Sequence, residues 1–279
     1  MAAVLDVHDD PLSQREALGL AGSPDANSVL RDLRDSNLAA FRWLVSQSAS
    51  FTSLAALDPA RTIIAPNATD TAHVVPGPWP SEPTIGFVSG AAPSRGIESL
   101  VEAARLVRRD FADVHLRLWL IGTDPDSERY LDELRASYVH EPWIQIGTAP
   151  YERLSQTLAQ ATVLTIPHPP SPYLDAVLPI KLFDSMAAGR PLVVTPRFET
   201  AQLVDRAGFG IVTEGDSPEA IAAALCRILG DERLAQSMGA RARLTAEREF
   251  DWRVVGARLA DELLSVRRYH PVLGLRRVR

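Results

Sequence analysis

The stretch "LPIKLFDSMAAGRPLVV", residues 178–194, contains a complete joint between a helix and a buried strand. Pro179 stands where a helix begins, since the first turn has no use for its missing N–H. The apolar side chains that follow recur on one face of a helix: Leu182, Phe183 and Met186. Gly189 then ends the helix and Pro191 opens a short apolar run. The stretch therefore predicts one helix-to-strand unit of an α/β fold.

The same alternation extends outward over the chain from residue 84. Apolar, β-rich runs predict six buried strands, at 84–90, 114–122, 143–148, 162–168, 191–195 and 210–214. Segments with helical period lie between them, which is the pattern of a doubly wound parallel sheet. Such a sheet binds ligands beyond the carboxyl ends of its strands. Four loops are expected on that rim: 89–96, 122–127, 147–151 and 168–179.

The first part of the chain is different. Residues 2–11 predict a strand that runs into a loop, residues 36–57 a helix, and residues 61–70 a strand and a turn. Four prolines between residues 74 and 83 predict an extended linker. This piece has too few strands for a sheet of ordinary size. We therefore divide the chain into five parts: a partial N-terminal domain (1–73), a Pro-rich linker (74–83), a complete α/β domain (84–249), a helix that could pack back on the N-terminal part (250–265) and a basic tail (266–279).

Composition narrows the class of protein. The chain has 279 residues, of which 46% are hydrophobic and 23% charged, as in soluble globular proteins. A net charge of -6 gives no reason to expect nucleic-acid binding. The single cysteine, Cys226, lies in an apolar helical pattern and is interpreted as a core residue. No stretch reads as a membrane span or a secretion signal, so a cytoplasmic protein is predicted.

Lys181 is the only lysine among 29 basic residues. It falls in the first turn of its predicted helix, where the helix dipole disfavours a cation. An anion that shares the site would explain it, because an ammonium group and free N–H groups together suit a phosphate. Asp184, one turn on, could accept hydrogen bonds from sugar hydroxyls. The alternative is that both side chains are ordinary solvated surface residues.

The loop "SGAAPSRG", residues 89–96, follows the first strand of the large domain. Ser89 and Gly90 are small enough to let a ligand approach the backbone, and Arg95 could fork onto phosphate oxygens. Such loops are common in α/β folds. Together with Lys181 on the same rim, however, Arg95 predicts a pair of cations that grips a diphosphate.

Two terminal features have competing interpretations. His8 ends an apolar strand beside Asp9 and Asp10, and it is either a site residue or a structural histidine. No second histidine at ligand spacing supports a metal site there. The run at 267–279 has five arginines with apolar residues between them. It is either a solvated tail or a contact with anionic lipid at a membrane surface.

The order of these motifs resembles the GT-B glycosyltransferases of group 1 (family four). The resemblance runs over residues 84–265, through "GFVSGAAPSRGIESLVEA", "IQIGTAPYERLSQTLAQATVLTIP", "LPIKLFDSMAAGRPLVVT" and "AGFGIVTEGDSPEAIAAAL". It implies an α/β fold of GT-B type, with one Rossmann-like doubly wound domain and a truncated N-terminal α/β domain. It also implies a retaining transferase that takes its sugar from a nucleotide-diphosphate donor.

Site residues follow from the resemblance by position. Arg95 and Lys181 would stabilise the leaving diphosphate without a metal ion or another cofactor, and His8 would lie near the transferred sugar. Asp184 matches the second glutamate of the E-x7-E motif, which is expected on the ribose. The donor-binding set implied in this way is Ser89, Gly90, Arg95, Gly147, Thr148, Ala149, Ile180, Lys181 and Asp184, with the backbone at 147–149 on the base. The acceptor, an unknown sugar, lipid or small molecule, would attack the same face of the donor sugar.

The sequence also departs from the family pattern. Ala176 occupies the position of the first glutamate, with Asp175 beside it, and the arginine usual in the first loop falls near Ala91. The chain begins within the N-terminal domain, so we expect a fragment or one half of an enzyme that a partner chain completes.

The alternative function is an inactive nucleotide-sugar-binding module or partner subunit. A nucleotide-binding oxidoreductase is disfavoured because no G-x-G-x-x-G follows a strand. Polysaccharide or glycoconjugate biosynthesis, at the inner membrane face or in the cytoplasm, is the expected setting.

Overall fold

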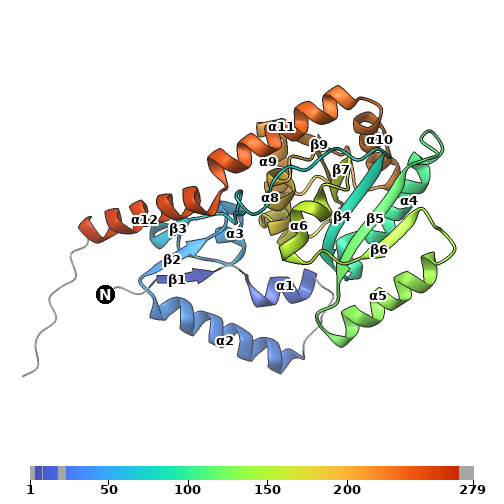
Figure 1. Ribbon diagram of the computed structural model, residues 1–279. Coiled ribbons are helices and arrows are strands. Elements are labelled where there is room, and N and C mark those ends of the chain that lie inside the picture. The colour runs from blue at the N-terminus through green and yellow to red at the C-terminus, as the bar shows by residue number, and fades with distance from the viewer. Residues whose placement is uncertain (1–3, 8, 18–22, 270–279) are drawn as a thin grey trace, which may run out of the picture.

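The larger of two parallel sheets is built by residues 84–212, in a computed structural model that describes residues 4–7, 9–17 and 23–269 (Figure 1). Its six strands are β4 (Thr84–Gly90), β5 (His115–Ile121), β6 (Ile144–Gly147), β7 (Val163–Ile166), β8 (Leu192–Val194) and β9 (Gly210–Val212). Their order is β6-β5-β4-β7-β8-β9. The chain therefore winds outward in both directions from the β4/β7 pair, which is the switch point where such sheets bind ligands. The predicted doubly wound sheet is confirmed.

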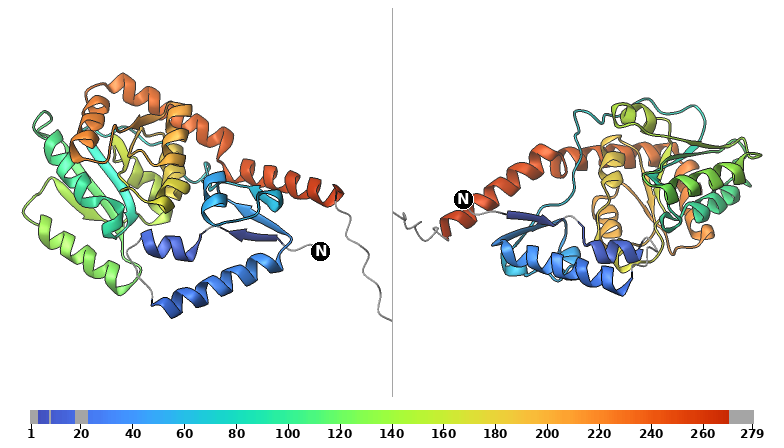
Figure 2. Two further views of the ribbon diagram at one scale, coloured as in Figure 1. Left: turned by 180° about the vertical axis from the view of Figure 1, so that it is seen from behind. Right: turned by 90° about the horizontal axis from the view of Figure 1, so that it is seen from below.

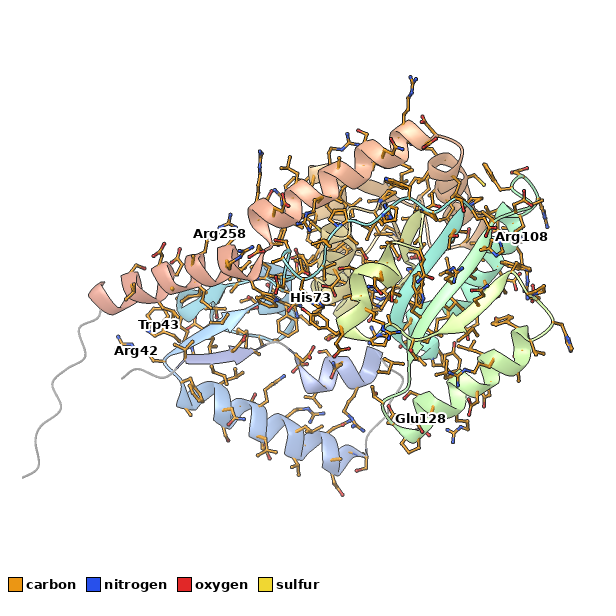
Figure 3. The ribbon with its side chains drawn as sticks, viewed as in Figure 1. Arg42, Trp43, His73, Arg108, Glu128 and Arg258 are labelled. Atoms are coloured by element: carbon orange, nitrogen blue, oxygen red, sulfur yellow. The ribbon has the colours of Figure 1, made fainter. Side chains whose placement is uncertain are left out.

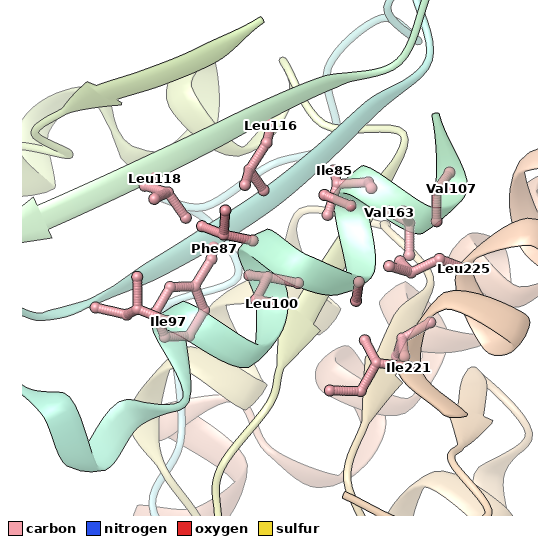
Figure 4. Close-up of a cluster of buried hydrophobic side chains, with 14 of the residues drawn as sticks. Ile85, Phe87, Ile97, Leu100, Val107, Leu116, Leu118, Val163, Ile221 and Leu225 are labelled. Atoms are coloured by element: carbon pink, nitrogen blue, oxygen red, sulfur yellow. The ribbon is translucent and has the colours of Figure 1, made fainter. Parts of the chain in front are cut away.

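Helices cover both faces of this sheet. They are α4 (Ile97–Val107), α5 (Pro125–Tyr138), α6 (Leu154–Leu158), α8 (Ile180–Ala187), α9 (Phe198–Ala207), α10 (Pro218–Leu229) and α11 (Glu232–Glu249). The short helix α7 (Pro172–Ala176) instead packs against the core of the N-terminal piece. On one face, α4 and α10 pack against Ile85 and Phe87 of β4 and Leu118 of β5 (Figure 4). On the other, α8 buries the stripe that the sequence predicts: Leu182, Phe183 and Met186.

The smaller sheet belongs to the N-terminal piece. Its parallel strands are β1 (Val4–Val7), β2 (Trp43–Ser46) and β3 (Thr62–Ile64), in that order. The helices α1 (Pro11–Ala17), α2 (Pro24–Ala40) and α3 (Ala49–Leu54) connect them. In Figures 1 and 2, α1 and α2 lie along this sheet and extend towards the large domain.

One element of the sequence prediction is wrong. Residues 36–57 do not form a single helix, because α2 ends at Ala40, β2 follows, and α3 begins after Ser48. Leu44 and Val45 are buried between the neighbouring strands β1 and β3, so strand pairing decides the conformation of this apolar run. Ser48 then caps a new helix by accepting a hydrogen bond from the amide of Phe51 at 2.9 Å.

The C-terminal helix α12 (Trp252–Tyr269) returns to the N-terminal sheet. Figure 2 shows α11 along the large domain and α12 continuing over the smaller one. Val255 of α12 packs in a small core with Val45, Ala65 and Ala68. At the bend between the two helices, the buried Asp251 carboxylate accepts hydrogen bonds from the amide and the hydroxyl of Thr71. In the described part of the chain, no helix is both long enough and apolar enough to cross a membrane.

Two arginines hold the Pro-rich segment against the large domain. Arg190 is 1% exposed, and its guanidinium donates to the carbonyls of Gly77, Pro78 and Ala159. Arg243 donates to the carbonyls of Val74 and two other residues, Thr71 and Ala187. The connection between the two pieces is therefore fixed to the large domain along its length.

Candidate functional site

A cavity of about 300 Å³ opens at the carboxyl ends of β4 and β7, at the switch point of the large sheet. Its wall comes from several parts of the chain. The N-terminal piece gives Asp9, Gln14, Gln47 and Asn67. The end of β4 gives Ser89 and Gly90, the loop after it gives Arg95, and the remainder comes from His168, from α7 and from the start of α8. A second cavity of about 980 Å³, between the same loop and α5, shares Gly90 and Arg95 with the first.

Lys181 lies at the cavity in the first turn of α8. Its Nζ donates to Ser89 Oγ at 2.7 Å and lies 4.9 Å from the centre of the Phe87 ring. Burial, together with the neighbouring Arg95 guanidinium, lowers the pKa of Lys181 well below its usual value. A cation held in this way is stabilised by an anion that enters the cavity.

Arg95 reaches the same cavity from the short 3-10 turn η2 (Pro93–Arg95). The next residue, Gly96, has a φ of +75°, and a Cβ there would lie 1.9 Å from the carbonyl oxygen of Pro167. This close approach fixes the turn against the end of β7. Burial lowers the pKa of Arg95, and Tyr173 and Asp9 oppose that effect. The structure thus brings Arg95 and Lys181 together, while the roles that the family resemblance gives them stay predictions.

Asp184 lies off the cavity wall, one turn along α8. Its carboxylate accepts a hydrogen bond from Thr69 Oγ1 at 2.7 Å, and burial raises its pKa to about 6. Two aromatic rings stand nearby, since His73 stacks on Tyr151 with ring centres 4.4 Å apart. Figure 3 shows His73 at the junction between the two pieces of the molecule. This group is suited to a ribose and a base rather than to a diphosphate.

Of the other residues predicted to contact the donor, some line the cavity and others lie near Tyr151. Ser89, Gly90 and Ile180 line the cavity with Arg95 and Lys181. Gly147 ends the edge strand β6, Thr148 and Ala149 follow it, and none of the three lines the cavity. They lead directly to Tyr151, and Ala149 packs against the core beneath α8. Their predicted contact with a base stays a prediction.

His8 lies outside the described residues, but its neighbour Asp9 is at the cavity. The Tyr173 hydroxyl donates to Asp9 Oδ1, which joins the loop after β1 to α7. Burial and this carboxylate raise the pKa of Tyr173 above its usual value. Among the described lining residues, Asp9 supplies the carboxylate. The sequence signal was its place beside His8, where the two aspartates were weighed only as part of a metal site.

The position of the missing glutamate is apolar in the structure. Ala176 is 4% exposed and packs in a core with Leu44 and Phe51. Asp175 points elsewhere, because its Oδ1 lies 3.5 Å from the Arg197 guanidinium and accepts from the amide of Phe198 at 3.3 Å. Asp175 therefore does not replace the family's first glutamate.

His168 is a cavity residue that sequence reasoning missed. It follows β7, is 1% exposed, and its Nε2 has no hydrogen-bond partner among the described residues. Burial, and then the charges of Lys181, Arg95 and Arg197, lower the pKa of His168 well below its usual value, which keeps the ring neutral. The available signal was its place in "TIPHPP", directly beyond a strand that ends at the rim.

Groups of three or more His, Cys, Asp or Glu side chains placed to hold a metal ion do not occur among the residues that the structure describes. The prediction that the reaction needs no metal ion or cofactor stays a prediction.

Comparisons with known proteins give a consistent result. Residues 82–231 match the model of the family described as "Glycosyl transferases group 1". A GDP-mannose-dependent alpha-(1-6)-phosphatidylinositol monomannoside mannosyltransferase of Mycolicibacterium smegmatis is 31% identical over 192 residues, which are 67% of this chain and 48% of that protein. A related mannosyltransferase of Corynebacterium glutamicum, which acts on a monoacylated substrate, is 29% identical over 66% of this chain and 47% of that protein. The chain thus spans about half the length of these curated relatives.

Solved structures show the same architecture. Anabaena HepE in complex with UDP-glucose has a TM-score of 0.75 at 17% identity, over 95% of this chain and 72% of that one. Sucrose-phosphate synthase from Thermosynechococcus elongatus has a TM-score of 0.74 at 17% identity, over 96% and 68%. These likenesses confirm the predicted GT-B fold.

Proposed function

The chain belongs to the glycosyl transferases of group 1, and from that premise we propose that it binds a nucleotide-diphosphate sugar and transfers the sugar to an acceptor. The observation that carries the proposal is the meeting of Arg95 and Lys181 in one cavity at the sheet's switch point. The curated relatives are named as GDP-mannose-dependent, and HepE is solved with UDP-glucose. GDP-mannose and UDP-glucose are therefore the first donors to test.

In this proposal the two cations act on the leaving group. Negative charge grows on the diphosphate as the bond to the sugar breaks. Arg95 can donate two parallel hydrogen bonds, and Lys181 supplies a compact ammonium group. Both are already in position before the reaction, so little reorganisation is needed when the charge develops. The acceptor would attack the face that the diphosphate leaves, with retention of configuration and without a metal ion.

Other side chains would contact the ribose, the base and the sugar of the donor. Asp184 would accept hydrogen bonds from the ribose, with the base near Tyr151 and the 147–149 backbone. Asp9 lies in the cavity with the two cations, where it can accept hydrogen bonds from sugar hydroxyls. It would supply the carboxylate that Ala176 lacks. The acceptor is proposed to be a lipid-linked or free glycoconjugate, by analogy with the names of the two mannosyltransferases.

Titration calorimetry with Lys181→Met tests the diphosphate site. Methionine keeps most of the side-chain volume and removes the charge, so binding of GDP-mannose or UDP-glucose should weaken by about tenfold to a hundredfold, the range for a lost hydrogen bond to a charged group. Arg135→Met, on the exposed face of α5, is the matched control for the loss of one cation and should bind as the wild type does. Equal affinity of Lys181→Met and the wild type would refute the role.

The second candidate function, an inactive binding module or partner subunit, is favoured by the buried Ala176. The two functions differ in turnover and not in binding. The chain, supplied with a donor that it binds and with a phosphatidylinositol monomannoside acceptor, should release nucleoside diphosphate if it is a complete catalyst. We expect slow but measurable release, since the chain spans about half the length of its curated relatives. Binding with no release at all would support the module.

A further inference from the structure

His168 is buried without a described hydrogen-bond partner for its Nε2 atom. Its side chain is 1% exposed, and its Nε2 lacks a hydrogen-bond partner in the part of the chain that the structure describes. An unsatisfied buried polar atom costs about 1–3 kcal/mol, and an apolar side chain of similar size would avoid that cost. Because buried polar groups almost always have partners, an unpaired one in a cavity wall indicates a ligand.

The charges around His168 indicate what kind of ligand this is. Lys181 from α8, Arg95 from η2 and Arg197 before α9 all act on the ring. Arg197 is neutralised by Asp216, whose two oxygens accept from it at 2.8 and 3.1 Å. Lys181, by contrast, donates to the neutral hydroxyl of Ser89. The Asp9 carboxylate balances only one of the two charges of Arg95 and Lys181, so the cavity carries an excess of positive charge that an anion would balance.

We propose that His168 is a third phosphate-binding group, which donates from Nε2 to the donor diphosphate and takes up a proton from solvent when that diphosphate binds. The inference rests on the proposed function and deepens it, since it concerns the same cavity. Without an anion, burial keeps the ring neutral, and the charges of Lys181, Arg95 and Arg197 act in the same direction. A bound diphosphate would oppose both effects, so that the ring gains a proton and a second N–H donor.

The test is calorimetry with GDP and UDP at pH 7.5 in HEPES and in Tris, two buffers with different ionisation enthalpies. The difference in binding heat between the buffers gives the number of protons taken up. His168→Asn removes the atom at the Nε2 position, so affinity should fall by about tenfold to a hundredfold. His168→Gln keeps an amide donor near that position but cannot be protonated. It should retain most of the affinity and lose the histidine's share of the proton uptake.

Two controls isolate the effect. His140→Gln, in the exposed turn just after α5, should leave both affinity and proton uptake unchanged. Guanosine and uridine, which lack phosphates, should bind the wild type and both His168 variants alike. If His168→Asn does not fold, the proton uptake of His168→Gln still decides the matter.

The outcomes separate the two proposals. A wild-type chain that binds neither GDP nor UDP overturns the proposed function and this inference with it. A wild-type chain that binds them, with proton uptake unchanged in His168→Gln and affinity unchanged in any folded His168→Asn, overturns the inference alone.

Discussion

Asp184 has a carboxyl group whose charge state depends on the fold. Burial raises its pKa from 3.8 to about 6, while the hydrogen bond from Thr69 and the nearby His73 act in the opposite direction. Between these two values the unfolded chain has lost the proton and the folded chain keeps it. The free energy of unfolding contributed by this group is therefore highest below pH 4, and it falls as the pH rises to about 6.

Asp184→Asn should remove that dependence. A pKa raised from 3.8 to about 6 corresponds to about 3 kcal/mol, so the variant should gain at most that amount relative to the wild type between pH 4 and pH 7. Urea unfolding of both proteins at the two pH values measures the difference. Asp132→Asn, at an exposed carboxylate of α5, controls for the loss of one charge. A constant gap between the wild type and Asp184→Asn would contradict the account.

Individual site residues were predictable where sequence context made them unusual. Lys181 is the only lysine, and its place in a first turn marked it as a candidate; the structure places it in one cavity with Arg95. His168 and Asp9 had no such mark, because a histidine or an aspartate after a strand is common. Their importance depends on burial and on partners distant in sequence, such as Tyr173 for Asp9. Residue type and spacing do not contain that information.

The turn η2 is the element that places Arg95. Gly96→Ala should disturb it, because the left-handed φ of +75° is strained for alanine and the added Cβ would meet the Pro167 carbonyl oxygen. We expect a loss of about 1–3 kcal/mol in the free energy of unfolding, with weaker binding of nucleoside diphosphates as Arg95 shifts. Urea unfolding and calorimetry with GDP measure the two effects. Gly215→Ala, where a Cβ meets nothing within 4 Å, should change neither. Unaltered binding by Gly96→Ala would show that the turn does not set the position of Arg95.

The elements of the large domain were predictable because each obeys its own local period. The apolar stripe on α8 and the apolar runs of β4 and β7 are buried in the core, as their sequence patterns predict. The run at Trp43–Ser46 fails this test, since four apolar or small residues fit a helix and a strand equally well. Its pairing with β1 and β3 decides the outcome, and that information lies outside the segment.

Asp251, at the bend between α11 and α12, is joined by hydrogen bonds to Thr71 near the end of the N-terminal piece. Hydrogen bonds from Arg253 and Thr71 hold the pKa of Asp251 well below its usual value. The stabilisation from this charge is therefore present above pH 4 and is lost as the pH falls further. Asp251→Asn should lower the free energy of unfolding at pH 7 by about 1–3 kcal/mol, because Thr71 loses its charged partner.

A double-mutant cycle with Thr71→Val measures the coupling between the two residues directly. Asp261→Asn, on the exposed surface of α12, should shift the free energy of unfolding by less than about 0.5 kcal/mol. Strictly additive effects of Asp251→Asn and Thr71→Val on the free energy of unfolding would mean that the hydrogen bond between these residues does not stabilise the bend.

The arrangement of the whole molecule was predictable only in outline. The GT-B order of motifs gave the fold, and four prolines marked the connecting segment. No sequence pattern indicates that Arg190 and Arg243 fix this segment, because both arginines donate to backbone carbonyls. Any residue type can offer a carbonyl, so no pattern of side chains records such contacts.

Because the chain has a single lysine, covalent labelling of amines can report on the cavity. Lys181 is the only side-chain amine in the chain, and its lowered pKa leaves more of it in the neutral, reactive form than of a solvated amine while no anion is bound. An amine-directed acylating reagent therefore has one side-chain amine to react with, and that amine lies in the cavity. Covalent labelling read by mass spectrometry would report occupancy, because a molecule seated beside Arg95 would shield the amine from the reagent.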